Sequence, residues 1–262
     1  MIRLIATDVD GTLVKESSKE VYPEYIPLIQ SLIDRGIIFV ISSGRQYSSV
    51  SKMFADVNRP MYYIVENGAH ILEGERTISV TQMRREDVEG IMADLRTFYP
   101  DCHVVASAPE GSFLETKDET FITMIRDQYR NQVHLVEDIL KADVNYVKLA
   151  IFKKNSIREY GEKILIPKWG DKVKACMAGE EWVDFMDDSV DKGNALRFLQ
   201  KRLGITPEET MVFGDNQNDT GMMFAAKESY AVENAVEEVR NAARHICPSF
   251  EDRGVYQVLK QV

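Results

Sequence analysis

The feature that most constrains the fold of this chain is an alternation of short apolar runs and amphipathic stretches near its beginning. Ile2–Thr7, Ile37–Ile41 and Tyr62–Val65 are short and apolar, as expected for strands that are buried on both faces. Residues 23–35 carry apolar side chains at helical spacing, and Gly36 follows as a helix-ending residue. Strand, helix, strand, helix, strand is the pattern of a parallel sheet with right-handed crossovers. We therefore predict an α/β core built on a parallel sheet.

This pattern is interrupted after about Gln82 and returns near Lys192. The intervening segment contains helical stretches and strand pairs that are typical of antiparallel hairpins. Its predicted strands are His103–Ala108, Ser112–Thr116, Val144–Phe152, Val173–Met177 and Trp182–Met186. We expect two domains: a core formed by residues 1–81 and 187–262, and an inserted α+β domain formed by residues 82–186.

Charge and cysteine content narrow the range of partners. The chain has 262 residues and a formal net charge of −10, which disfavours binding to nucleic acid or to an anionic membrane surface. Cys102, Cys176 and Cys247 are dispersed, so reduced thiols are favoured over a disulfide or a zinc site. Neither a signal peptide nor a membrane-length apolar run is evident. We expect a cytoplasmic protein, and we leave its oligomeric state open.

Two aspartates, Asp8 and Asp10, follow the first predicted strand. Residues two apart on a strand point to the same side, and ligands of parallel sheets bind at the carboxyl ends of strands. Two carboxylates about 4 Å apart repel by ~1 kcal/mol in water and ~4 kcal/mol at an effective dielectric constant of about 20. Mg²⁺ would offset this repulsion, since it prefers oxygen ligands and accepts one or two carboxylates together with phosphate oxygens. The alternative is a solvated loop end that caps a helix.

Three further segments carry polar residues at comparable positions. Asp215 follows the apolar strand at 211–213 and is favoured as a third oxygen ligand, whereas Asp219 suits helix capping as well as a metal site. Ser43, within Ser42-Ser43-Gly44 after the second strand, could bind an anion, although an ordinary turn is the simpler interpretation. Lys192 would by itself be interpreted as a surface lysine; its position at the return into the core gives it weight.

Taken in order, these segments resemble the four motifs of the haloacid dehalogenase (HAD) superfamily of phosphatases. The matching residues are DVDGT at 8–12, ISSGR at 41–45, VDKGNAL at 190–196 and GDNQND at 214–219. ENGAHI (66–71) and YAVENAVEEVR (230–240) resemble the Cof-type subgroup, whose large α+β cap is inserted between the second and third motifs. The resemblance implies a Rossmann-like, HAD-like catalytic core and a cap domain, residues 82–186, that selects the substrate.

The resemblance also implies a role for each motif residue. Asp8 would be the nucleophile that becomes a phosphoaspartate, and Asp10 would be the general acid and then the base. Mg²⁺ would be bound by Asp8, Asp215 and the backbone carbonyl of Asp10, with Asp219 supporting from nearby. The phosphoryl oxygens would be held by side chains and backbone N–H groups at Val9, Ser43, Gly44, Lys192 and Asn218. Asp191 stands where the family often has serine.

The sequence thus predicts a Mg²⁺-dependent phosphatase that acts on small phosphorylated metabolites such as sugar phosphates, through a phosphoaspartate. A sugar phosphomutase is one alternative, and a non-catalytic Mg²⁺-dependent binding protein is the other. The substrate itself is not readable from the sequence. Arg45, Glu181 and Trp182 are candidates for substrate selection, although ordinary surface or packing roles are favoured for each.

Overall fold

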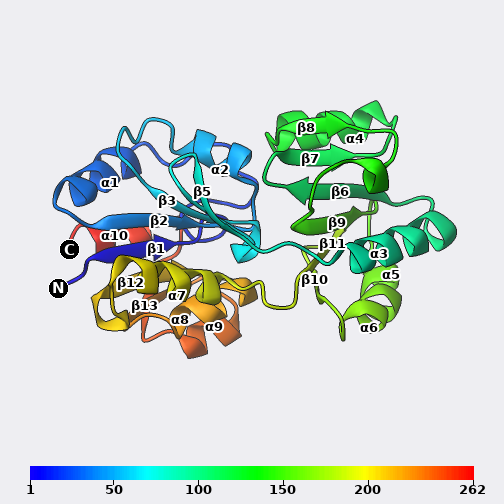
Figure 1. The fold of residues 1–262 in the computed structure, drawn as a ribbon. Coiled ribbons are helices and arrows are strands. Elements are labelled where there is room, and N and C mark those ends of the chain that lie inside the picture. The colour runs from blue at the N-terminus through cyan, green and yellow to red at the C-terminus, as the bar shows by residue number, and fades with distance from the viewer. The chain divides into compact units, whose positions relative to one another are not determined.

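The computed structural model describes residues 1–262, which form two units. The core unit comprises Met1–Ser79 and Asp191–Val262, and the inserted unit comprises Val80–Val190. In Figure 1 the inserted unit is the green and yellow-green part of the ribbon. The sequence placed the boundaries at 82 and 186 instead. No helix has both the length and the apolar character needed to cross a membrane.

The core unit contains an eight-stranded sheet in the order β14-β13-β12-β1-β2-β3-β4-β5. The strands from β14 to β3 are parallel, and β4 runs antiparallel to β3. This confirms the predicted α/β core, but β4, β5 and β14 were not predicted. The strands are β1 (Leu4–Thr7), β2 (Ile38–Ser42), β3 (Tyr62–Val65), β4 (His70–Glu73), β5 (Arg76–Val80), β12 (Thr210–Gly214), β13 (Glu228–Val232) and β14 (His245–Cys247).

Helices cover both faces of this sheet, with α1 and α2 on one face and α7, α8 and α9 on the other (Figure 1). The apolar stripe of α1 is fully buried at Ile29 and Leu32, which fixes its position on the sheet. Asp191 caps the start of α7, and its side chain accepts a hydrogen bond from the Asn194 N–H at 3.0 Å. The helices are α1 (Tyr25–Asp34), α2 (Tyr47–Met53), α7 (Lys192–Leu203), α8 (Thr220–Met223), α9 (Glu237–Ala242) and α10 (Gly254–Leu259).

The register of the central strands brings three loops to one edge of the sheet. Thr7 at the end of β1 lies opposite Phe213 of β12 and Ile41 of β2. The register continues one residue further, since the Asp8 N–H donates to the Phe213 carbonyl at 3.0 Å. The residues that follow β1, β2 and β12 therefore leave the sheet side by side, which is the usual place for a ligand site in a parallel sheet.

The inserted unit has a six-stranded sheet in the order β10-β11-β9-β6-β7-β8. All neighbouring strands are antiparallel except β7 and β8, so the predicted α+β character is present. β8 was not predicted, and the strand expected at 144–152 begins only at Lys148. The strands are β6 (His103–Ala108), β7 (Gly111–Leu114), β8 (Val133–Leu135), β9 (Lys148–Phe152), β10 (Lys174–Met177) and β11 (Trp182–Met186).

Helices and apolar side chains cover both faces of this second sheet. Trp182 packs with its ring centroid 4.9 Å from that of Phe152 and 6.2 Å from that of Phe121, which supports a packing role. The helices are α3 (Arg85–Phe98), α4 (Glu119–Thr123), α5 (Arg158–Tyr160) and α6 (Ile166–Trp169), with π-helical turns η2 (Met124–Gln128) and η4 (Gly161–Leu165) and a 3-10 turn, η3 (Ile139–Lys141).

Candidate active site

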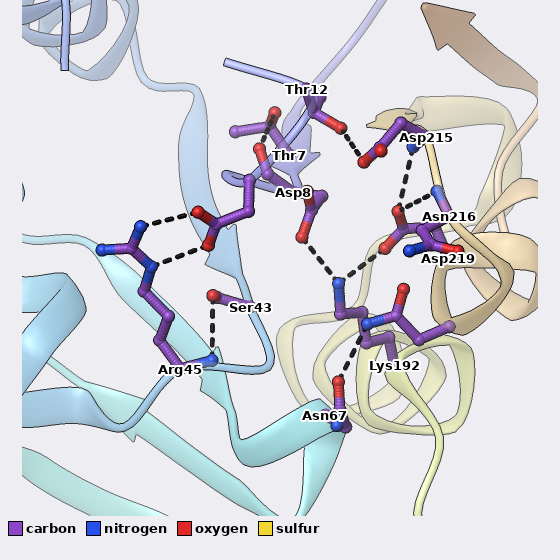
Figure 2. A network of polar contacts seen from close by, with 12 residues as sticks. Thr7, Asp8, Thr12, Ser43, Arg45, Asn67, Lys192, Asp215, Asn216 and Asp219 are labelled. Carbon is purple, nitrogen blue, oxygen red and sulfur yellow. Dashed lines mark hydrogen bonds and ion pairs between the residues drawn. The ribbon is translucent and has the colours of Figure 1, made fainter. Parts of the chain in front are cut away.

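Charged side chains from three segments of the core unit meet at the carboxyl edge of its sheet. Lys192, the first residue of α7, places its Nζ 2.7 Å from Oδ1 of Asp8 and 2.6 Å from Oδ1 of Asp219. Asp8 follows β1, Asp215 follows β12, and Asp219 ends the 3-10 turn η6 (Gln217–Asp219). Figure 2 shows Lys192 between the two carboxylates, with Asp215 beside Asp219. The predicted convergence of these loops is therefore present.

Lys192 is fully buried, with 0% of its surface exposed. Burial alone lowers the pKa of an amine, but the carboxylates of Asp219 and Asp8 outweigh it and hold the pKa of Lys192 above its usual value. The ammonium is therefore permanently charged. It is not the surface lysine that its sequence context alone would suggest.

The three carboxylates of Asp8, Asp215 and Asp219 form an acidic cluster, with one oxygen from each lying within 4.8 Å of the others. Burial, together with the neighbouring carboxylates, raises the pKa of Asp8 well above its ordinary value. Burial and the charge of Asp219 raise the pKa of Asp215 to about 7. When all three carboxylates are ionised, their charges outnumber the single Lys192 ammonium, so the cluster has a net negative charge.

A divalent cation fits this cluster. Oδ2 of Asp8 is buried and has no hydrogen-bond partner, which is costly for a carboxylate oxygen unless a cation or donor joins it. Both oxygens of Asp219 are engaged, Oδ1 by Lys192 and Oδ2 by the N–H groups of Asp215 and Asn216 at 3.0 and 3.1 Å. The oxygens best placed to ligate a cation therefore belong to Asp8 and Asp215. Asp219 orients the loop that carries Asp215.

Contact with Asp215 explains why the DVDGT motif has glycine at position 11 and threonine at position 12. The Thr12 hydroxyl donates to Oδ1 of Asp215 at 2.8 Å, so it holds that carboxylate in place. Gly11 has a φ of +83°, and a Cβ at this position would lie 2.3 Å from Oδ2 of Asp215. The loop after β1 can therefore approach the β12 loop this closely only with glycine at position 11.

Gly11→Ala is expected to displace Asp215 and to weaken the binding of a divalent cation by about 10-fold or more, as for losses next to metal ligands. Gly36→Ala is the matched control, because Gly36 has a φ of +87° but no atom within 4 Å of the added Cβ. Both variants should lose about 1–2 kcal/mol of stability from left-handed backbone strain. Calorimetric titration with MgCl₂ measures the cation affinity of each variant, which should fall only in Gly11→Ala. Equal affinity in the two variants would show that the contact with Asp215 has no effect on the cation.

Asp8 and Asp10 do not lie as the sequence argument placed them. Strand β1 ends at Thr7, before both aspartates, so strand geometry does not set their side chains on one side. Asp10 is instead paired with Arg45, whose Nε and one terminal nitrogen donate to its two oxygens at 2.7 and 2.6 Å. Each aspartate thus has its own cation, Lys192 for Asp8 and Arg45 for Asp10.

The residues predicted to hold a phosphoryl group surround the same edge. The Ser43 hydroxyl accepts from the Arg45 N–H at 3.1 Å and donates to no group of the chain. Asn218 donates its amide to Oδ1 of Asn67 at 2.9 Å, while its own Oδ1 is buried without a partner. Val9 is buried in the loop after β1. Gly44 packs against Asn67, since a Cβ on it would lie 2.9 Å from the Asn67 Oδ1.

Three residues of this site make contacts that the sequence analysis did not predict. Thr12 lies inside the DVDGT motif, and its hydroxyl was a signal that could have been used. Arg45 is the last residue of ISSGR and was considered only for substrate selection. Asn67 lies in a turn where both it and Glu66 have positive φ values, 58° and 49°, a conformation that no apolar pattern reveals.

Comparison with known proteins identifies a family and several similar phosphatases. The family model described as haloacid dehalogenase-like hydrolase matches residues 5–259. The chain is 26% identical to 5-amino-6-(5-phospho-D-ribitylamino)uracil phosphatase YbjI of Escherichia coli, covering 100% of this chain and 96% of that protein. It is 25% identical to the phosphatase of the same substrate named YwtE in Bacillus subtilis, covering 100% and 98%.

A solved structure has a fold similar to that of this chain. A protein from Eubacterium rectale is 38% identical, with a TM-score of 0.90 over 99% of this chain and 98% of that one. The predicted phosphatase class and the predicted resemblance to the capped Cof-type subgroup are confirmed by these relatives. The chain belongs to the haloacid dehalogenase-like hydrolase family.

Proposed function

We propose that this phosphatase hydrolyses small phosphorylated metabolites with Mg²⁺ and through a phosphoaspartate on Asp8. The observation that carries the proposal is the buried Asp8 carboxylate, which has one oxygen bound to Lys192 at 2.7 Å and the other without a partner. Hydrolases of this family generally use a divalent metal, and the acidic cluster of Asp8, Asp215 and Asp219 is suited to one. Mg²⁺ is favoured among divalent ions because the available ligands are oxygens.

The first step transfers the phosphoryl group to the protein. A carboxylate oxygen of Asp8 forms a bond to phosphorus while the bond from phosphorus to the leaving alcohol oxygen breaks. Asp10 enters this step as the neutral carboxylic acid, donates its proton to that oxygen and becomes a carboxylate. When bound by Asp8, Asp215 and the Asp10 carbonyl, with Asp219 in support, Mg²⁺ neutralises the negative charges that converge there. The Lys192 ammonium adds a second, fixed positive charge.

The second step returns the protein to its starting state. Asp10, now a carboxylate, takes a proton from a water molecule, and the water oxygen attacks the phosphorus of phospho-Asp8. The bond between Asp8 and phosphorus breaks and inorganic phosphate leaves. The Ser43 hydroxyl, which donates to no group of the chain, supports a role in holding phosphoryl oxygens, alongside Lys192, Asn218 and the N–H groups near Val9 and Gly44.

The substrate class is proposed from the names of the relatives. Two relatives are named for a phosphorylated ribityl compound, and a third, from Serratia proteamaculans, is named HMP-PP phosphatase. We therefore favour phosphate esters of small sugars or polyols. The inserted unit is proposed to select among them. A cytoplasmic location is part of the proposal, and the free thiols of the three cysteines fit it.

A panel of phosphorylated metabolites tests this function. The panel holds hexose phosphates, 5-amino-6-(5-phospho-D-ribitylamino)uracil and p-nitrophenyl phosphate, assayed with MgCl₂ or EDTA at a pH above the raised pKa of Asp215. We expect inorganic phosphate from at least one ester, and loss of that activity in EDTA. Isomerised sugar phosphate without phosphate release would favour the phosphomutase. Binding without turnover across the panel would favour the non-catalytic binding protein.

A further inference from the structure

Arg45 and Asp10 form an ion pair with two hydrogen bonds, separate from the cluster of Lys192 with Asp8, Asp215 and Asp219. Its guanidinium donates from Nε to Oδ2 of Asp10 at 2.7 Å and from a terminal nitrogen to Oδ1 at 2.6 Å. Only 16% of the Arg45 side chain and 27% of the Asp10 side chain are exposed. Such a two-point contact fixes the plane of the carboxylate as well as its position.

The Asp10 carboxylate has one further donor. The backbone N–H of Ser17 donates to its Oδ1 at 3.0 Å, and Ser17 has a φ of 61°. Two donors from Arg45 and one from Ser17 therefore set the orientation of this side chain. The Ser17 N–H contacts one oxygen only and cannot fix the rotation of the carboxylate by itself. The guanidinium is what restrains that rotation.

Arg45 is itself held by the loop that carries Ser43. Its backbone N–H donates to the Ser43 Oγ at 3.1 Å, and its carbonyl accepts from the Glu66 N–H at 3.1 Å. A terminal nitrogen of its guanidinium lies 3.2 Å from Sδ of Met53 in α2. The side chain thus links the loop after β2 to the aspartate after β1, and its position is set at both ends.

We propose that Arg45 is the positioning residue for the Asp10 carboxylate. It acts through Asp10 and contributes by holding the proton-transferring group in one orientation next to the reacting centre. This inference rests on the proposed function, in which Asp10 protonates the leaving alcohol oxygen. A displacement of about 1 Å in such a group can cost about 100-fold in rate. Lysine cannot reproduce the two-point contact, because its ammonium is a single flexible point of charge.

The dependence of rate on the leaving group tests this role. An alkyl phosphate needs a proton on its leaving oxygen, whereas p-nitrophenolate leaves readily without one. Arg45→Gln should lower kcat/KM, which reports on phosphoryl transfer to Asp8 and not on the later hydrolysis, by about 100-fold for the best alkyl phosphate of the panel and by less than about 10-fold for p-nitrophenyl phosphate. Arg45→Lys should show the same pattern with a smaller loss.

Arg59→Gln is the matched control. The Arg59 guanidinium donates from Nε and from a terminal nitrogen to the two oxygens of Asp34, at 2.6 and 3.1 Å, on the exposed surface of the core unit. Its loss should leave kcat/KM for both substrates unchanged. A general effect of removing an arginine–aspartate pair would appear in both arginine variants, whereas a positioning effect appears only at Arg45.

A double-mutant cycle with Asp10→Asn shows whether Arg45 acts through Asp10. If it does, adding Arg45→Gln to Asp10→Asn should lower kcat/KM for the alkyl phosphate by less than about threefold, although Arg45→Gln alone lowers it by about 100-fold. Independent, additive losses, or equal losses for the two leaving groups, would overturn the inference. Failure of the proposed function itself would look different, because Asp8→Asn would then retain activity. Circular dichroism of Arg45→Lys provides a folded reference if Arg45→Gln is unstable.

Discussion

Asp8→Asn is expected to abolish phosphatase turnover, with a loss of at least about 1,000-fold, while the fold is retained. Removal of a nucleophile typically costs this much or more, because binding and charge stabilisation alone give only residual catalysis. Asparagine has nearly the same shape and keeps an oxygen that can accept from Lys192. The pKa of Asp8 is raised mainly by burial, so the neutral amide should not destabilise the metal-free protein.

The measurement is phosphate release from p-nitrophenyl phosphate, with a thermal denaturation curve for each protein. Asp34→Asn is the matched control, since it makes the same chemical change at an exposed residue of the core unit. It should retain normal turnover. Turnover of Asp8→Asn within about tenfold of the unsubstituted protein would reject a nucleophilic role for this residue.

Lys192→Met is expected to cost about 3–5 kcal/mol in the free energy of unfolding, the range found when one partner of a buried ion pair is removed. Lys192 is the only cation within 4 Å of Asp8 and Asp219, both of which are almost fully buried. Without it, two carboxylates face each other in a region of low dielectric constant. Turnover should also fall by about 100-fold or more, because a fixed positive charge is lost next to the reacting phosphate.

Urea denaturation in EDTA measures this cost. Lys168→Met is the control, because the Lys168 side chain in its pair with Asp94 is 51% exposed, and ion pairs of exposed lysines contribute about 1 kcal/mol or less. Adding Asp219→Asn to Lys192→Met should recover part of the lost stability, since one of the two facing charges is then removed. A loss below about 1 kcal/mol in Lys192→Met would mean that the ammonium does not hold the cluster together.

The sequence was sufficient to predict the central strands and the convergence of Asp8, Lys192 and Asp215. Buried strands are continuous apolar runs, and parallel strands deliver their following residues to one edge of the sheet. These two rules act over long distances in the sequence and depend little on local detail. They also distinguished the inserted α+β segment, whose strands turn back in hairpins.

The sequence was insufficient where the outcome depends on backbone conformation or on short edge strands. The orientations of Asp8 and Asp10 depend on where β1 ends and on the positive φ of Gly11, and neither is encoded in apolar periodicity. The pairing of Arg45 with Asp10 depends on how the loops after β1 and β2 approach each other, which the sequence pattern does not show. Strands β4, β5 and β8 are short and lie at or near sheet edges, where a weak apolar pattern suffices for pairing.

The central claim is that Asp8 takes the phosphoryl group before water does, so hydrolysis occurs in two displacements at phosphorus. The most direct measurement is the stereochemical course of hydrolysis of a thiophosphate ester made chiral at phosphorus with oxygen isotopes. Each displacement inverts the configuration, so a covalent phosphoaspartate predicts overall retention. Overall inversion would mean that water attacks the substrate directly, and it would contradict the account.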